Sequence, residues 1–189
     1  MSLEEKVQEV EAVFHRLDSA IARFQTGSSL HCPPGCGKCC FKADIEATAL
    51  EFLPFALHIY REGHAETWRE KLKATDSSIC LILNPQQGGT GLCSDYQYRG
   101  LICRLFGYSA RTNKYGKREL VTCHVIKTGQ QEFYEKTSQE VEAGGEIPVM
   151  NEYYMQLHGI DADLARDFYP INTAMRKALE AVMHYYAYR

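Results

Sequence analysis

Apolar side chains recur every three or four residues through the first part of the chain, as they do on the buried face of an amphipathic helix. Ser2 is followed three residues later by Glu5, which is the spacing of a capping box at the start of a helix. The apolar positions are Val7, Val10, Phe14, Leu17, Ile21 and Phe24. The pattern predicts a helix over residues 2–25 that packs on a core. A coiled-coil arm is the alternative, because the pattern covers about the three heptads that such an arm requires.

Glycine and proline interrupt this periodicity over residues 26–42, which predicts a loop. Asp44 then has the position of a helix cap, and the pattern predicts a second helix from Asp44 to Ile59 with a kink at Pro54. A short third helix is expected over residues 67–74, around Trp68.

The pattern changes over residues 78–125. A short apolar run at 79–83 leads into a turn-rich connection at 84–91, and segments 105–111 and 118–125 flank a turn as in a β-hairpin. Helical periodicity returns at 130–142, 148–158 and 171–188, where Asn172 is the expected N-cap. The predicted fold is mainly α with a small β-hairpin, in one domain over residues 1–189. Its parts are an N-terminal helix (2–25), an irregular cysteine-rich core (31–125) and C-terminal helices (130–189).

The composition is that of a globular protein, since 45% of the 189 residues are hydrophobic and 24% are charged. The net charge of −3 provides no basic field for nucleic acid or an anionic membrane, so neither is an expected partner. No apolar run approaches the roughly 18 residues of a membrane span. The N-terminus lacks the basic and apolar regions of a secretory signal, so a cytoplasmic location is expected, with a protein or small molecule of unknown identity as partner.

The unusual feature of the composition is its eight cysteines, which are too dilute for a disulfide-scaffold miniprotein. Four of them lie within nine residues, at Cys32, Cys36, Cys39 and Cys40. Gaps of two and three residues let a loop turn several thiolates toward one point, and Lys38 lowers the cost of ionising them. A metal ion or cluster is therefore the main interpretation. Redox-active thiols and inert packing are the alternatives.

The vicinal pair Cys39–Cys40 raises the question of how many metal sites there are. In an extended chain neighbouring side chains point to opposite faces, so the two thiols are expected to diverge and to serve two sites. The remaining cysteines are Cys80, Cys93, Cys103 and Cys123. With them, two adjacent centres of four ligands could form, with Cys80 and Cys123 divided between them. The alternative is one centre with spare, buried cysteines.

The cysteine block resembles the YkgJ family, described as zinc- or iron-chelating domains or iron–sulfur proteins. The resemblance spans about residues 32–106 and rests on Cys32, Cys36, Cys39, Cys40, Cys80, Cys93, Tyr96, Arg99, Cys103, Arg104 and Phe106. One departure is Gly100, where the family usually has proline. Flagellin lysine N-methylases resemble the same block. The resemblance implies a ligand set rather than a reaction, and residues 107–189 lie outside it.

Several neighbours of the cysteines have two interpretations each. Arg99 and Arg104 flank Cys103 and are expected to offset the charge of a thiolate-rich cofactor, or else to bind an anionic substrate. Tyr96 and Phe106 are expected to pack as a dry shell around the metal. His31 and His124 adjoin cysteines, and imidazole could replace a thiolate. They are secondary candidates, because the cysteines suffice as ligands.

The compact spacing favours an iron–sulfur cluster over zinc as the cofactor. The triplet Cys32, Cys36 and Cys39 also has the spacing of a radical-SAM loop, but the chain lacks the required strand–helix barrel. The glycine-rich segment 88–91 has no lysine or following helix for a phosphate loop.

Three functions remain open. The first is a soluble iron–sulfur protein with redox or cluster-dependent modification chemistry. The second is a zinc-stabilised interaction module without catalysis, and the third is a methylase-like modifying enzyme. The sequence does not decide whether the protein is an enzyme.

Overall fold

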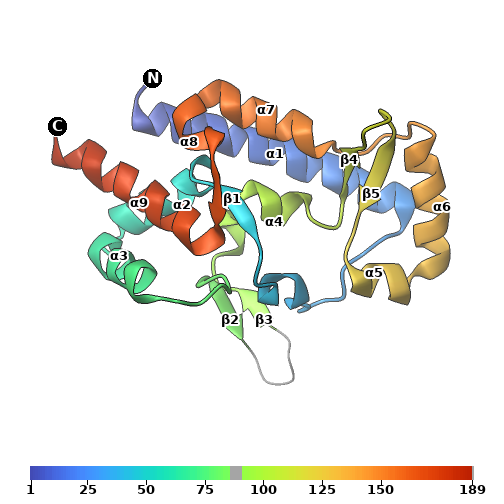
Figure 1. Cartoon of the computed structure of the whole chain (residues 1–189), viewed down its shortest axis with the longest axis horizontal. Coiled ribbons are helices and arrows are strands. Elements are labelled where there is room, and N and C mark those ends of the chain that lie inside the picture. The colour runs from blue at the N-terminus through green and yellow to red at the C-terminus, as the bar shows by residue number, and fades with distance from the viewer. Residues whose placement is uncertain (86–90, 189) are drawn as a thin grey trace. The chain divides into compact units, whose positions relative to one another are not determined.

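The structure is a computed structural model that describes residues 1–85 and 91–188. It is mainly helical with small two-stranded sheets, which confirms the predicted fold class (Figure 1). The chain divides into two compact units. Unit 1 contains residues 1–12, 35–100 and 157–189, and unit 2 contains residues 13–34 and 101–156. Because the units interleave along the chain, the expectation of one domain stays a prediction.

The first helix, α1 (Leu3–Ser28), confirms the sequence prediction and extends it by three residues beyond position 25. Its start is a capping box, in which the Ser2 N–H donates to Glu5 Oε2 at 2.7 Å and the Glu5 N–H donates to Ser2 Oγ at 3.1 Å. All six positions of the predicted apolar stripe are buried. The helix therefore packs on a core through this stripe, as expected.

In unit 1, the last helix, α9 (Ile171–Ala187), packs against α2 (Leu53–Arg61) and α3 (Ala65–Ala74) (Figure 1). The buried face of α9 follows helical spacing and consists of Ile171, Ala174, Met175, Ala178, Leu179 and Val182. The short helix α8 (Ala162–Arg166) precedes strand β6 (Phe168–Pro170), which pairs antiparallel with β1 (Glu46–Thr48).

The predicted helix over residues 44–59 is wrong in its first half. Residues 46–48 form β1, where Ala47 is paired with Tyr169, and a 3₁₀ turn η2 (Leu50–Phe52) follows. The α-helix begins only at Leu53, so Pro54 lies in its first turn and causes no kink. Proline fits there because the first N–H groups of a helix have no partner within it.

A hairpin that the sequence did not predict carries one of the cysteines of unit 1. Strand β2 (Leu83–Pro85) pairs antiparallel with β3 (Gly91–Cys93), and β3 contacts the 3₁₀ helix η1 (Lys38–Phe41). A further 3₁₀ turn, η3 (Tyr96–Tyr98), follows the hairpin. Residues 88–90 of the glycine-rich segment lie outside the described residues.

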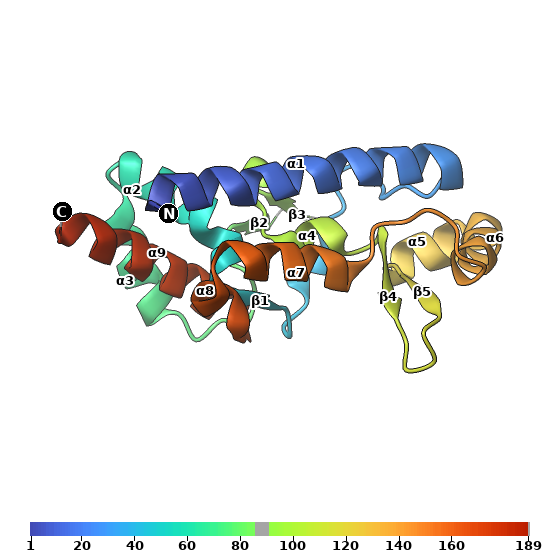
Figure 2. The ribbon, with the colours of Figure 1, turned by 90° about the horizontal axis from the view of Figure 1, so that it is seen from above.

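Unit 2 contains the hairpin predicted around residues 112–116, as β4 (Ser109–Thr112) and β5 (Arg118–Val121). Figure 2 shows this hairpin beside α5 (His124–Gly129) and α6 (Gln131–Glu142). The other helices are α4 (Leu101–Leu105) and α7 (Met150–Ile160), the last of which runs on into unit 1. The core of unit 2 consists of Phe24, Leu30, Ala110, Ile126, Val141 and Ile147. The short helices α4, α5 and α8 were not predicted.

In the described part of the chain, no helix combines the length and the apolar character that a bilayer span needs. Even α1, with 26 residues, carries charged residues in its first turn and along its exposed face.

Candidate metal centre

The vicinal cysteines Cys39 and Cys40 lie side by side in η1, with their Sγ atoms 4.0 Å apart. The expectation that they diverge assumed an extended chain, and that assumption is wrong. In a 3₁₀ helix with three residues per turn, consecutive side chains are separated by about 120° rather than 180°. Two thiolates held at about 2.3 Å by one tetrahedral ion lie about 3.8 Å apart. The observed pair is therefore close to the geometry in which both sulfurs serve one ion.

Cys39 is unusually acidic. Its pKa is lowered from 9.0 to about 6, first because the Cys40 side chain hydrogen-bonds to it, then because backbone N–H groups and the positive charge of Arg99 also favour the thiolate. The Cys39 side chain is exposed. A thiolate is thus present at neutral pH on the surface of unit 1, and thiolate is the form that binds metal.

Cys80 and Cys93 form a second pair of thiols in unit 1, at the base of the β2–β3 hairpin. A turn closed by the Leu83 N–H and the Cys80 carbonyl, 3.1 Å apart, precedes β2, and Leu83 is paired with Cys93. Burial raises the pKa of Cys80 to about 11, with the charge of Cys93 adding to the effect. Burial also raises the pKa of Cys93. Both thiols therefore carry protons at neutral pH.

Arg99 acts on one thiol of each pair. Its positive charge lowers the pKa of Cys39 and opposes the rise in the pKa of Cys93. The guanidinium lies 3.5 Å from the ring centroid of Tyr96, and Nε donates to the Tyr96 carbonyl at 3.1 Å. Tyr96 is 62% exposed, so it does not form part of the expected dry shell.

In unit 2, Cys32 is held by its neighbours in the fold. The Cys32 N–H donates to the Tyr108 hydroxyl at 2.6 Å. Beside it, the Gln130 side chain accepts from the His31 N–H at 3.0 Å and donates to the His31 carbonyl at 2.6 Å. Burial raises the pKa of Tyr108, and the charges of Cys32 and Cys123 raise it further, so both thiols lie near this phenol.

Cys123 has a structural role of its own. It is the N-cap of α5, and its Sγ accepts from the Ile126 N–H at 3.4 Å. It also packs against the core of unit 2. Cysteine is a small apolar residue that packs well. His124 follows Cys123 as the first residue of α5 and is exposed.

Cys103 and Arg104 lie in α4 of unit 2. Arg104 is buried, forms an ion pair with Asp18 and lies over the ring of Phe14 at 4.6 Å. Phe106, which follows α4, is half-buried. A role for Arg104 in offsetting cofactor charge stays a prediction.

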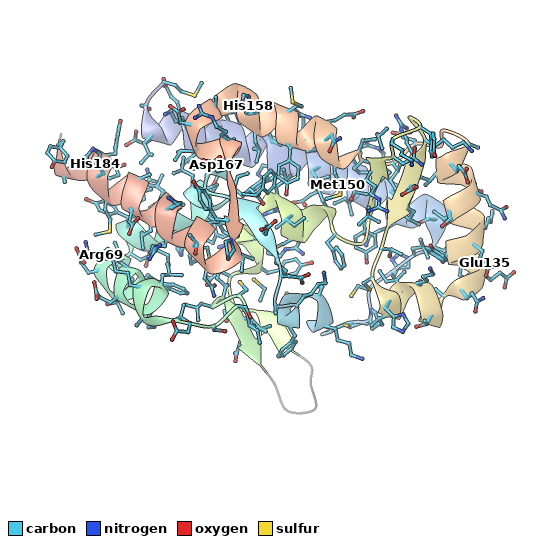
Figure 3. The ribbon with its side chains drawn as sticks, viewed as in Figure 1. Arg69, Glu135, Met150, His158, Asp167 and His184 are labelled. Carbon is cyan, nitrogen blue, oxygen red and sulfur yellow. The ribbon has the colours of Figure 1, made fainter. Side chains whose placement is uncertain are left out.

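The predicted ligand set spans both units. Cys36, Cys39, Cys40, Cys80 and Cys93 belong to unit 1, whereas Cys32, Cys103 and Cys123 belong to unit 2. A centre shared by all of them therefore stays a prediction. Within unit 1, Figure 3 shows sulfur atoms, in yellow, beside the β2–β3 hairpin.

The cysteine thiols of unit 1 are suitable metal ligands, but in the described residues they are not arranged around one ion. Among residues 1–85 and 91–188, no three His, Cys, Asp or Glu side chains converge as the ligands of one ion. The segments that carry the two pairs are nevertheless in contact, since β3 contacts η1. The charge of Arg99 also acts on one thiol of each pair, Cys39 and Cys93. In their chemistry, these thiols fit a cysteine-bound metal.

Sequence reasoning missed two carboxamides that hold the cysteine-bearing segments. Gln130 bonds the backbone of His31, next to Cys32, as described above. Asn172 bonds the backbone on both sides of Cys80 and is not the N-cap of α9, which is Pro170. In the sequence, Asn172 stands out only as a polar residue directly beside the apolar stripe of α9, which could have indicated a buried hydrogen-bonding role.

Comparison with known proteins gives one family. The model of the CxxCxxCC family, described as a putative zinc- or iron-chelating domain, matches residues 31–138, which is more than half of the chain. The comparisons with curated proteins and with solved structures gave no match. The matched range begins before the first cysteine and ends within α6.

Proposed function

This chain belongs to the CxxCxxCC family of zinc- or iron-chelating domains, and on that premise we propose that it binds one tetrahedral zinc or iron ion in unit 1. The ligands would be the thiolates of Cys39, Cys40, Cys80 and Cys93. The observation that carries the proposal is the 4.0 Å separation between the sulfurs of Cys39 and Cys40.

That separation supports a single ion over a four-iron cluster. A single tetrahedral ion brings two thiolates to about 3.8 Å from each other. A four-iron cluster with four cysteines has one cysteine on each iron, which keeps the sulfurs farther apart. A two-iron cluster has two cysteines on each iron, so it is the second candidate, and it retains the iron–sulfur chemistry expected from the sequence.

A set of four thiolates also bears on the role of the metal. Structural zinc sites are closed by four protein ligands, whereas catalytic zinc sites keep a position open for water or substrate. Four thiolates close the coordination sphere, which supports a metal that stabilises the fold or carries an electron. Such an ion would supply binding energy that is also folding energy.

The state of the thiols supports a defined order of events on metal binding. Cys39 is ionised at neutral pH and exposed, so it is suited to meet the metal first. Cys80 and Cys93 must lose protons, because burial holds their pKa values above the usual range. Metal binding is therefore expected to release protons and to order the hairpin against η1.

Elemental analysis of anaerobically purified protein, with assay of acid-labile sulfide, tests the cofactor. We expect about one zinc or iron per chain and no sulfide. Two irons with two sulfides would establish the second candidate. Four irons with four sulfides would contradict the geometric argument.

Single substitutions test the ligand set. Cys40→Ser should lower metal affinity by more than about 100-fold, since loss of a supporting residue alone costs 10–100-fold in known sites. Cys123→Ser is the matched control, because Cys123 caps α5 and packs in unit 2. Equal loss of metal from both variants would contradict a centre confined to unit 1.

A further inference from the structure

Asn172 lies in the first turn of α9, with its side chain against the segment that carries Cys80. Its Nδ2 group donates to the carbonyls of Ser77 and Ile79 at 2.9 and 2.8 Å, and its Oδ1 accepts from the Leu81 N–H at 3.0 Å. We propose that this carboxamide is a positioning group that fixes the backbone on both sides of Cys80, so that the Cys80 thiolate is placed to bind metal. The inference rests on the proposed function.

The segment needs such a group because it has no regular structure. Residues 75–82 connect α3 to β2 without a helix or strand, so their backbone groups lack the partners that a ladder provides. Figure 1 shows the start of α9 beside this connection. One carboxamide offers two N–H donors and an acceptor in a single plane, and here both ends are used. The Asn172 side chain thus supplies hydrogen bonds that a neighbouring strand would otherwise give to this segment.

The burial of Asn172 supports a specific role. The residue is 6% exposed and lies among the apolar side chains with which α9 packs on α2 and α3. A buried polar group costs free energy unless it is hydrogen-bonded. An apolar residue would pack at this position without needing hydrogen-bond partners. The contribution specific to asparagine is therefore its hydrogen bonds to the backbone on both sides of Cys80.

The consequence falls on Cys80. This thiol is half-buried and lies where the charge of Cys93 acts on it. A backbone fixed at Ile79 and Leu81 prevents Cys80 from turning away. Because α9 lies beyond residues 31–138, the C-terminal helix would thereby support a centre built in the family domain.

Titration of the metal-free full chain with Co²⁺ tests the proposal, since the thiolate-to-cobalt absorption band reports the number of bound thiolates. Asn172→Ala should weaken Co²⁺ affinity about 10–100-fold, as loss of groups that orient ligands does in known metal sites. It should also reduce the band at saturation by one thiolate's share. Thr173→Ala, in the same turn of α9, should change neither quantity.

The same measurement in a Cys80→Ser background separates positioning from general stability. There Asn172→Ala should have no further effect on affinity, because the thiolate that it positions is gone. An equal loss in both backgrounds, or an unchanged band in Asn172→Ala alone, would overturn the proposal.

Asn172→Asp covers the case in which alanine does not fold. It keeps the acceptor for the Leu81 N–H and removes both donors, so it should show the same missing thiolate. If this variant too is unfolded, Asn172 is only structural and the proposal fails. If the unchanged chain binds no Co²⁺, the proposed function fails instead. If it binds Co²⁺ but Cys80→Ser alters nothing, Cys80 is not a ligand, and both the proposed ligand set and the role given to Asn172 fail. If Cys80→Ser removes a thiolate from the band and Asn172→Ala does not, only the role given to Asn172 fails.

Discussion

The two pairs of cysteines in unit 1 differ in exposure and in acidity. Cys39 and Cys40 lie in a 3₁₀ helix, where a shared hydrogen bond lowers the pKa of Cys39 to about 6. Cys80 and Cys93 lie at the base of a hairpin, where burial raises the pKa of both thiols and that of Cys80 reaches about 11. The pKa of cysteine is thus shifted in opposite directions in these two segments.

The difference shows what each segment contributes to a metal site. In the first pair, Cys39 is exposed and costs little to ionise, but a short helix in a glycine- and proline-rich loop holds the pair. The half-buried pair costs more to ionise but is fixed by strand pairing and by Asn172. We infer that the first pair favours capture and the second favours retention of the metal.

Alkylation of the metal-free protein should show the largest contrast between the pairs. At neutral pH we expect Cys39 to react with iodoacetamide about 100-fold faster than Cys80. Its greater thiolate fraction outweighs the lower nucleophilicity that comes with a low pKa. Mass spectrometry of the digested protein measures both rates in one sample.

The alkylation rates of Cys39 and Cys80 should change with pH in different ranges. The Cys39 thiolate disappears as pH falls through about 6, so the rate at Cys39 should fall tenfold per pH unit below that value. The rate at Cys80 should still be rising at pH values approaching 11. Alkylation rates that change with pH in the same way at Cys39 and Cys80 would contradict the difference in pKa between the two thiols.

Elements with strong periodicity were predictable from the sequence. The capping box and the apolar stripe of α1 both depend on residues that are close in the chain, and so does the hairpin around residues 112–116. By contrast, β1 exists because Ala47 pairs with Tyr169, more than a hundred residues away. A local pattern contains no information about that partner, so the segment was predicted as the start of a helix.

The candidate site was predictable in its ligands but not in its support. Cysteine spacing identified the thiols, because metal ligation requires that residue type in close succession. The expected divergence of Cys39 and Cys40 was wrong, since it depended on whether the backbone is extended or 3₁₀. The contribution of Asn172 depends on a contact between α9 and residues 77–81, which no motif within either segment records.

A smaller effect is expected from Gly100, which follows the arginine that acts on both pairs. A Cβ atom here would lie 2.9 Å from Cζ of Phe52, a ring that is 1% exposed and has little room to move. Gly100→Ala should therefore destabilise the metal-free protein by about 1–3 kcal/mol, the usual cost of overpacking. Urea unfolding measures this.

Gly27→Ala is the control for Gly100→Ala. Gly27 lies in α1 with open space around the position of a Cβ, so alanine there should be neutral or stabilise by about 0.5–1 kcal/mol. If both alanine variants unfold at the same urea concentration as the unchanged chain, the contact with Phe52 imposes no constraint at position 100.

The smallest effect should come from Arg99 itself, and it tests whether charge or contact links the two pairs. Arg99→Gln removes the positive charge that favours the Cys39 thiolate, so the pKa of Cys39 should rise and its alkylation at neutral pH should slow. The rise should be only a small part of the total lowering of the Cys39 pKa, because the hydrogen bond from Cys40 is its largest cause and Arg99 a lesser one. Arg99→Lys keeps the charge but not the planar stacking on Tyr96, so the alkylation rate of Cys39 should stay near that of the unchanged chain.

Added salt tests the same point. It should narrow the gap in alkylation rate between Arg99→Gln and the unchanged chain, since salt screens a charge but not a hydrogen bond between neighbouring thiols. A gap that salt leaves untouched would show that Arg99 acts through its packing on Tyr96.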